Sequence, residues 1–178
     1  MTICNSDFNH DSILVIGYGN SLRSDDGAGC RVADIVASWE LPYVRSLTVH
    51  QLTPELAEPI SQAELAIFVD ACMDASPQLR RVRKPQKALQ VQKIVISREM
   101  ESGANPNFVS VGHVVDPRSL LSLAEQIYGK TPVAYALLLP AVNWEFGEQL
   151  SAVTRKSIDQ AVDFLQNLCT KLVSFNQC

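Results

Sequence analysis

The chain has 178 residues, with 47% hydrophobic and 19% charged residues, which is ordinary for one globular domain with a sizeable core. Its formal net charge of −4 gives no reason to expect a nucleic acid or an anionic membrane surface as partner. The five cysteines form no CxxC pair, so we expect a reduced, cytoplasmic protein rather than a disulfide scaffold or a structural zinc site. We predict neither a signal peptide nor a membrane span.

In chain order, the apolar runs and helical periodicities predict strands that alternate with helices. Residues 1–11 are predicted to be a flexible tail. Short apolar or alternating runs predict strands at 12–17, 44–50, 65–71, 93–97 and 133–142. Helices are predicted from Gly27 to about Trp39, from Thr53-Pro54 to about Gln62, from Asp116-Pro117 onward, and over about 151–173. The alternation predicts a three-layer αβα sandwich with a mostly parallel central sheet, as a single domain over 12–178.

The most unusual segment is GYGNSLRSDDGAG, residues 17–29, which follows the first strand and places two carboxylates after a glycine-rich turn. A dinucleotide-binding motif would need a third glycine where Leu22 stands, and Asp25 and Asp26 would repel a pyrophosphate. A phosphate-binding P-loop is excluded because this glycine-rich segment does not end in GK[ST]. One of the two acids could instead cap the helix that begins near Gly27.

Ligands of open α/β sheets gather beyond the carboxyl ends of the strands, and three segments bring polar groups there. Asp25 and Asp26 follow the first strand, Asp70 ends the run LAIFVDA, and His113 lies in the segment SVGHVVDPRS. Two carboxylates and an imidazole suit a first-row transition metal such as nickel or zinc. Asp70 could equally be a turn residue, and His113 a hydrogen-bonded polar residue.

Other residues give weaker signals. Cys72 could form a nucleophilic pair with His113, but a small buried hydrophobic residue is its simpler interpretation. The basic residues between 80 and 87 fit a solvated loop face. No GxSxG or HExxH motif is present, so neither a serine hydrolase nor a zinc protease of that type is indicated.

Taken together, ILVIGYGNSLRSDDGAGCRV, LAIFVDA and GHVVDPRSLLSLAEQIYG resemble, in order and spacing, the [NiFe]-hydrogenase maturation endopeptidases. LLLPAVNWEFGEQLS and the long final helix are similar to the C-terminal part of the same family. The likeness runs from about residue 12 to 170, and GxGNxLRxDDGxG is its most specific part.

The resemblance implies a cytoplasmic, aspartic-type endopeptidase that removes a C-terminal extension from the precursor of the hydrogenase large subunit. Such enzymes act after nickel has been inserted, and they cut after a His or Arg. The family's metal-contacting and catalytic positions fall on Asp26, Asp70 and His113. The nickel would belong to the substrate, and no tightly bound cofactor of the protein's own is expected. We expect a monomer.

The chain departs from the family pattern at two places. The first acid is often Glu in the family, and here it is Asp26, which leaves open whether Asp25 or Asp26 is the ligand. Many members carry Asp-x-Gly-Thr where this chain has HQLTPEL. His50, Gln51 and Leu52 resemble the type acting on the bidirectional, NAD-linked hydrogenase, which implies a role in substrate selection. Two alternatives remain open: a metallohydrolase with its own metal, and a non-catalytic nickel-checking chaperone.

Overall fold

The computed structural model describes residues 13–73, 89–96 and 115–176. The predicted tail at 1–11 and the candidate ligand His113 lie outside these ranges. In chain order the elements are β1 (Ile13–Tyr18), the 3-10 turn η1 (Ser24–Gly27), α1 (Ala28–Ala37), β2 (Val44–Val49), the 3-10 turn η2 (Pro54–Leu56), α2 (Ala57–Gln62), β3 (Leu65–Met73), β4 (Gln90–Ile94), α3 (Pro117–Tyr128), β5 (Val133–Ala141) and α4 (Ala152–Asn176).

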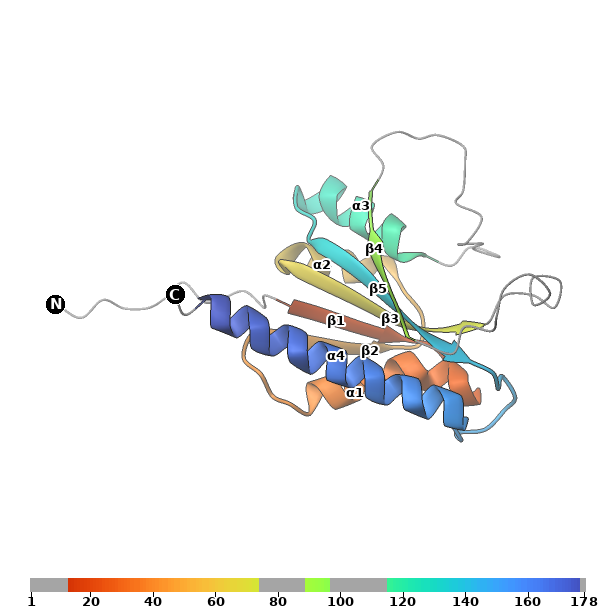
Figure 1. Cartoon of the computed structure of the whole chain (residues 1–178). Helices are drawn as coiled ribbons and strands as arrows, with labels where there is room; N and C mark the ends of the chain where they lie inside the picture. The colour runs from red at the N-terminus through yellow and green to blue at the C-terminus, as the bar shows by residue number, and fades with distance from the viewer. Residues whose placement is uncertain (1–12, 74–88, 97–114, 177–178) are drawn as a thin grey trace, which may run out of the picture.

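The described strands form one sheet in the order β2-β1-β3-β5-β4. β1, β2, β3 and β5 are parallel, and β4 pairs antiparallel with β5 at one edge. Helices α1 and α4 cover one face of the sheet, while α2 and α3 pack against each other on the opposite face (Figure 1). The predicted three-layer αβα arrangement with a mostly parallel sheet is therefore confirmed.

The central strands are apolar on both faces because each face is covered by helices. Ile13 and Val15 of β1 belong to the core cluster that includes residues of α1 and α4. Leu14 and Ile16, which alternate with them, belong to the second cluster, with residues of α2 and α3. This explains why the continuous run ILVI correctly predicted a strand.

Glycines let α1 lie directly against the sheet. A Cβ atom on Gly17 of β1 would come within 2.0 Å of the carbonyl oxygen of Gly29 in α1. A Cβ atom on Gly29 would in turn come within 2.3 Å of the carbonyl oxygen of Val69 in β3. Because the neighbouring atoms belong to the backbone, they could not move aside for a side chain at Gly17 or Gly29. They hold the start of α1 next to the carboxyl ends of β1 and β3.

The main departure from the predicted elements is β4, one of the two edge strands of the described sheet. The prediction placed it at 93–97 and assigned 75–92 to a polar stretch, whereas β4 occupies Gln90–Ile94 and residues 95–96 are not in the strand. An edge strand is half-covered, so its sequence, QVQKI, lacks the continuous apolar run that identified β1 and β3.

Two predicted helix starts have different outcomes. α3 begins where predicted, and Asp116 caps it, since its side chain accepts a hydrogen bond from the Ser119 backbone N–H at 2.9 Å. Thr53 precedes η2 and α2 as predicted, but its side chain accepts no capping hydrogen bond. The chain there begins as a 3-10 turn, in which Leu56 N–H donates to the Thr53 carbonyl.

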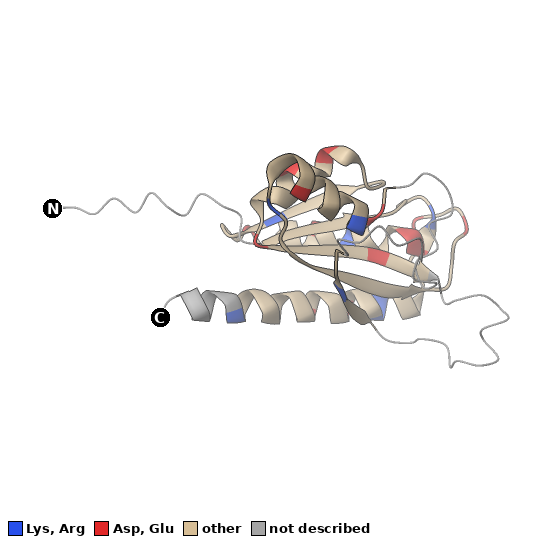
Figure 2. Ribbon diagram, turned by 90° about the horizontal axis from the view of Figure 1, so that it is seen from above, with Lys and Arg blue, Asp and Glu red and all other residues tan. Residues whose placement is uncertain are grey.

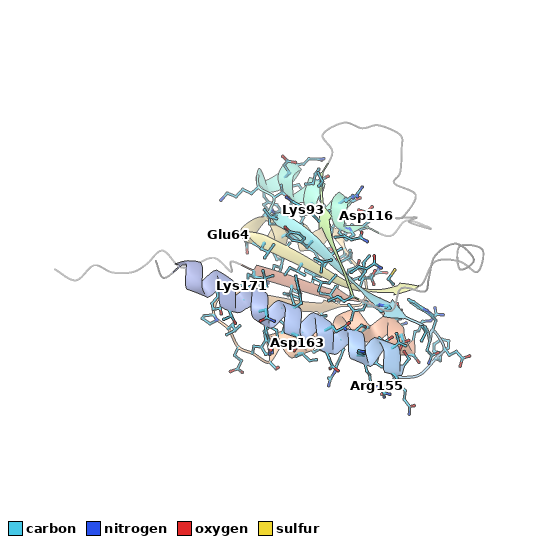
Figure 3. The ribbon with its side chains drawn as sticks, in the orientation of Figure 1. Glu64, Lys93, Asp116, Arg155, Asp163 and Lys171 are labelled. Carbon is cyan, nitrogen blue, oxygen red and sulfur yellow. The ribbon has the colours of Figure 1, made fainter. Side chains whose placement is uncertain are left out.

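Charged side chains are spread over the described part of the molecule. In Figure 2, Lys and Arg are interspersed with Asp and Glu rather than gathered along one element. Along α4, for example, Asp163 lies between Arg155 and Lys171 (Figure 3). Among the described residues, none of the helices combines the length and apolar content that crossing a bilayer requires.

Candidate functional site

The strand order places a topological switch point between β1 and β3. From β1 the chain moves to β2 on one side of it, and then to β3 on the other. Ligands of open α/β sheets bind in the crevice outside the carboxyl ends of the strands at such a point. Asp26 follows β1 through a short loop, and Asp70 lies in the last part of β3. The two predicted carboxylates therefore flank the switch point.

Asp25, although adjacent to Asp26, is turned into the protein. Its side chain is 0% exposed and accepts three backbone hydrogen bonds from the segment between β5 and α4. One carboxylate oxygen accepts from Val142 N–H at 2.9 Å and Asn143 N–H at 2.8 Å, and the other accepts from Ser151 N–H at 2.7 Å. We call this arrangement the Asp25 junction.

The electrostatics of Asp25 match a structural role. Burial raises the pKa of its carboxyl, but the hydrogen bonds donated by Ser151, Val142 and Asn143 outweigh burial and hold the pKa below its ordinary value. The sequence had suggested that one of the two acids caps the following helix. The Asp25 side chain caps neither η1 nor α1. With its oxygens occupied by backbone donors, Asp25 is poorly suited to bind a ligand, which leaves Asp26 as the candidate.

Further hydrogen bonds join the loop after β1 to the segment after β5. Ser24 N–H donates to the Gly147 carbonyl at 2.6 Å, and Gly147 N–H donates to the Leu22 carbonyl at 2.9 Å. The Ser24 hydroxyl donates to the Glu145 carbonyl at 3.1 Å. Two segments more than a hundred residues apart in sequence are thus fixed to each other beside the candidate site (Figure 1).

Asp26 is partly exposed and anchored from one side. Its Oδ2 accepts a hydrogen bond from Asn20 N–H at 3.1 Å. The turn comes close because Gly19 has a φ of +134°, and a Cβ atom on Gly19 would lie 2.0 Å from the Asp26 carbonyl oxygen. The glycine-rich turn therefore orients a carboxylate, in place of the phosphate that such turns bind elsewhere.

Asp70 shares a hydrogen bond with Tyr18, the last residue of β1. Burial raises the pKa of the Asp70 carboxyl to about 7, with the hydrogen bond from Tyr18 acting to lower it and the negative charge of Asp26 acting to raise it. Burial and the charge of Asp70 raise the pKa of the Tyr18 hydroxyl well above its ordinary value, so Tyr18 remains a donor. Sequence reasoning missed Tyr18. Its only signal was a phenol at the end of a buried strand.

Cysteine chemistry finds little support at this edge. The Cys30 thiol donates to the Gly19 carbonyl at 3.4 Å and the Val49 carbonyl at 3.5 Å. Burial, with the charges of Asp34 and Asp26, raises its pKa to about 11, which disfavours a reactive thiolate. Cys72 is partly buried near the end of β3, and its predicted partner, His113, lies outside the described residues.

The residues expected to select the substrate divide into two kinds. His50 and Gln51 follow β2 at the same sheet edge and are exposed. Leu52 is buried and packs in the core cluster under α2 and α3. Direct contact with a partner is therefore open to His50 and Gln51, whereas Leu52 can act only by fixing the backbone of the turn.

The structure describes two of the three predicted metal ligands. Asp26 and Asp70 are near enough for the charge of one to raise the pKa of the other, and His113 lies outside the described ranges. Within residues 13–73, 89–96 and 115–176, no group of three or more His, Cys, Asp or Glu side chains is arranged to hold a metal. A complete three-ligand site would thus need His113 or a ligand supplied by the substrate.

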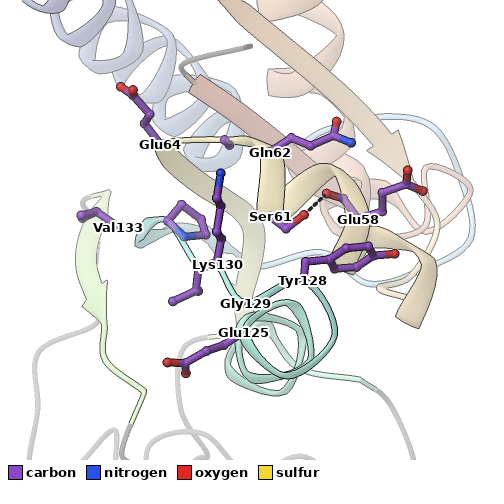
Figure 4. A pocket seen from close by; sticks show the side chains of 12 residues that line it. Glu58, Ser61, Gln62, Glu64, Glu125, Tyr128, Gly129, Lys130 and Val133 are labelled. Atoms are coloured by element: carbon purple, nitrogen blue, oxygen red, sulfur yellow. Dashed lines mark hydrogen bonds between the residues drawn. The ribbon is translucent and has the colours of Figure 1, made fainter.

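A cavity of about 940 Å³ lies near the amino ends of β3 and β5, between α2, α3 and the start of β5. Glu58, Glu125 and Lys130 are among its lining residues, which Figure 4 shows from close by. Ligand sites of this fold class lie at the carboxyl edge, and the acids with linked electrostatics are there. We therefore place the candidate site at the Asp26–Asp70 pair.

No family model and no curated protein sequence matches the chain, whereas several solved structures share its fold. A hydrogenase maturating endopeptidase, HybD from E. coli, superposes with a TM-score of 0.62 at 17% identity, over 89% of this chain and 92% of that one. Hydrogenase 2 maturation peptidase from Thaumarchaeota archaeon SCGC_AB-539-E09 gives a TM-score of 0.60 at 22% identity, over 89% and 97%. The [NiFe] hydrogenase maturation protease HycI from Thermococcus kodakarensis gives 0.59 at 17% identity, over 89% and 92%.

These similarities cover nearly all of each chain. At such low identity they establish a shared fold, and function has to be argued from the site.

Proposed function

We propose that this protein is an endopeptidase that removes the C-terminal extension from the nickel-loaded precursor of the [NiFe]-hydrogenase large subunit. The observation that carries the proposal is the Asp26–Asp70 pair at the β1/β3 switch point, within a fold shared with solved hydrogenase maturation proteases. Asp25 is taken up by the Asp25 junction, so the two remaining acids are available for chemistry at this edge.

Asp26, Asp70 and His113 would engage the nickel carried by the substrate. Two carboxylates at one edge attract a cation, and an imidazole suits nickel. A bound cation would favour the ionised form of Asp70, whose pKa is raised by burial. Precursor without nickel would lack the charge that the acids need, which would restrict cleavage to precursor that already carries the metal.

The chemical step would be the attack of water on the scissile carbonyl. One of the two carboxylates would act as general base, or the substrate's metal would polarise the carbonyl. Tyr18 would keep the Asp70 carboxylate oriented through its hydrogen bond. The protein would act as a cytoplasmic monomer, without a tightly bound cofactor of its own.

His50 and Gln51 would contact the precursor beside the site, with Leu52 fixing their turn. Their resemblance to the type that matures the bidirectional, NAD-linked hydrogenase supports that precursor as the substrate. Exchange of His50 and Gln51 for the residues of another type should change which precursor is cut, without affecting folding.

The proposal is tested by intact-mass analysis of a large-subunit precursor after incubation with the protein, with and without inserted nickel. We expect loss of a C-terminal peptide only from the nickel-loaded form. Asp26→Ala and Asp70→Ala should abolish processing, while Asp163→Ala, at an exposed position of α4, should process normally.

Other outcomes favour the alternatives. Stoichiometric metal in the purified protein, together with hydrolysis of other peptides, would favour a metallohydrolase. A stable complex with uncut precursor under all conditions would favour a nickel-checking chaperone. Full processing by Asp70→Ala would refute the assigned site.

A further inference from the structure

Next to the Asp26–Asp70 pair, three large apolar side chains point into solvent. Phe146 is 87% exposed, Val142 is 59% exposed and Leu22 is 57% exposed. Scattered exposed apolar residues are common, but these three come from two segments that are hydrogen-bonded to each other at one sheet edge. We call them the Phe146 patch.

The Phe146 patch is held rigidly. Val142 N–H donates to Asp25, and Gly147, next to Phe146, exchanges hydrogen bonds with Leu22 and Ser24. The Arg23 guanidinium lies 5.8 Å from the centre of the Phe146 ring and donates to the Trp144 carbonyl at 3.4 Å. An exposed aromatic ring on a fixed backbone loses little entropy when a partner covers it, which is the property of an interface anchor.

Acidic groups border the patch. Glu145 and Glu148 are exposed on the same segment, and Asp26 is partly exposed on the other. The one basic side chain among these two segments, Arg23, already contacts Phe146 and the Trp144 carbonyl. The surface therefore offers apolar contact together with negative charge, and its complement is an apolar segment that carries Lys or Arg.

We propose that the Phe146 patch docks a protein segment that presents apolar side chains together with basic residues, next to the Asp26–Asp70 pair. This inference rests on the proposed function for one point only, namely that the segment belongs to the precursor that is cut. The patch would provide affinity for the substrate protein, while the acids perform the chemistry.

Binding can be measured with short fluorescein-labelled peptides that share one set of apolar residues and carry Lys, Ser or Glu at the polar positions. We expect the Lys peptide to bind most tightly, the Ser peptide less tightly and the Glu peptide most weakly. Phe146→Ser should raise the Kd of the Lys peptide about tenfold or more. The matched control is Ile127→Ser, since Ile127 is 61% exposed on α3, and it should leave the Kd unchanged.

Charge is tested separately by Glu148→Lys, which should weaken binding of the Lys peptide several-fold, and more strongly at low ionic strength. Glu58→Lys on α2, away from the carboxyl edge, is its control. Both Phe146 and Glu148 are exposed, so the thermal unfolding midpoint should stay unchanged in these variants.

The same variants are then compared on the nickel-loaded precursor. Tighter binding and faster cleavage by wild type than by Phe146→Ser would support docking of the substrate. Normal cleavage by both proteins, or a Glu peptide that binds as well as the Lys peptide, would overturn the inference and leave the proposed function standing. Phe146-dependent peptide binding without any cleavage of precursor would support the docking surface and refute the proposed function. Absence of peptide binding to wild type would overturn the inference.

Discussion

The Asp25 junction and the Asp26–Asp70 pair lie at the same edge of the sheet, yet they use carboxylates in opposite ways. Asp25 is fully buried, and hydrogen bonds from backbone N–H groups 117 to 126 residues away offset the unfavourable free energy of burying its charge. Asp70 is also largely desolvated, but its pKa is raised, and it shares the edge with a second acid. The comparison shows that partners, more than burial, distinguish a structural carboxylate from a candidate catalytic one.

The largest expected effect is on stability at the Asp25 junction. Asp25→Ala would leave three backbone N–H groups without their acceptor and should lower the free energy of unfolding by about 3–5 kcal/mol. Asp26→Ala, one residue on, loses one partly exposed hydrogen bond and should cost at most about 1 kcal/mol. Urea denaturation compares the two, and equal losses would contradict the distinction.

Asp70→Asn should have the opposite effect on stability. The folded pKa of Asp70 is about 7, above its unfolded value, so the favourable contribution of its protonated form is present at low pH and is lost as pH rises toward 7. Replacement by a neutral amide should therefore stabilise the fold by about 1–3 kcal/mol at pH 8, and by almost nothing at pH 4. Asp163→Asn on α4 is the control, and a pH-independent effect of Asp70→Asn would refute the assignment.

Tyr18→Phe tests the hydrogen bond between the Tyr18 hydroxyl and the Asp70 carboxyl. Loss of the hydroxyl removes a hydrogen bond that lowers the pKa of Asp70, so that pKa should rise further above its ordinary value. The free energy of unfolding at neutral pH should fall by about 1 kcal/mol. NMR titration of the Asp70 carboxyl carbon provides the measurement, and an unchanged pKa would exclude the hydrogen bond.

The smallest effect is expected at Asp116, a fourth carboxylate, whose charge contributes to the raised pKa of Tyr18. Its side chain caps α3, and Asp116→Ala should cost about 0.5–1 kcal/mol. Asp116→Asn keeps a capping oxygen and should restore most of this loss. Thermal unfolding of the two variants separates the capping hydrogen bond from the charge.

The sequence predicted the layers of the fold because β1, β3 and β5 are covered on both faces and are therefore continuously apolar. It misplaced β4, since an edge strand needs no such run. It also brought Asp26 and Asp70 to one edge, because parallel strands share their carboxyl ends. The role of Asp25 could not be predicted, since its donors are backbone groups of Val142, Asn143 and Ser151, whose side chains give no signal.

The distance along the chain between Asp25 and its donors has a consequence for how the protein is made. Synthesis proceeds from the N-terminus, so β1, α1 and β2 leave the ribosome long before residues 142–151 exist. Until then the Asp25 carboxylate has none of its three backbone donors, and the loop that carries Asp26 is not fixed. The candidate site can therefore be completed only when nearly the whole chain has been synthesised, and fragments that end before β5 would lack it.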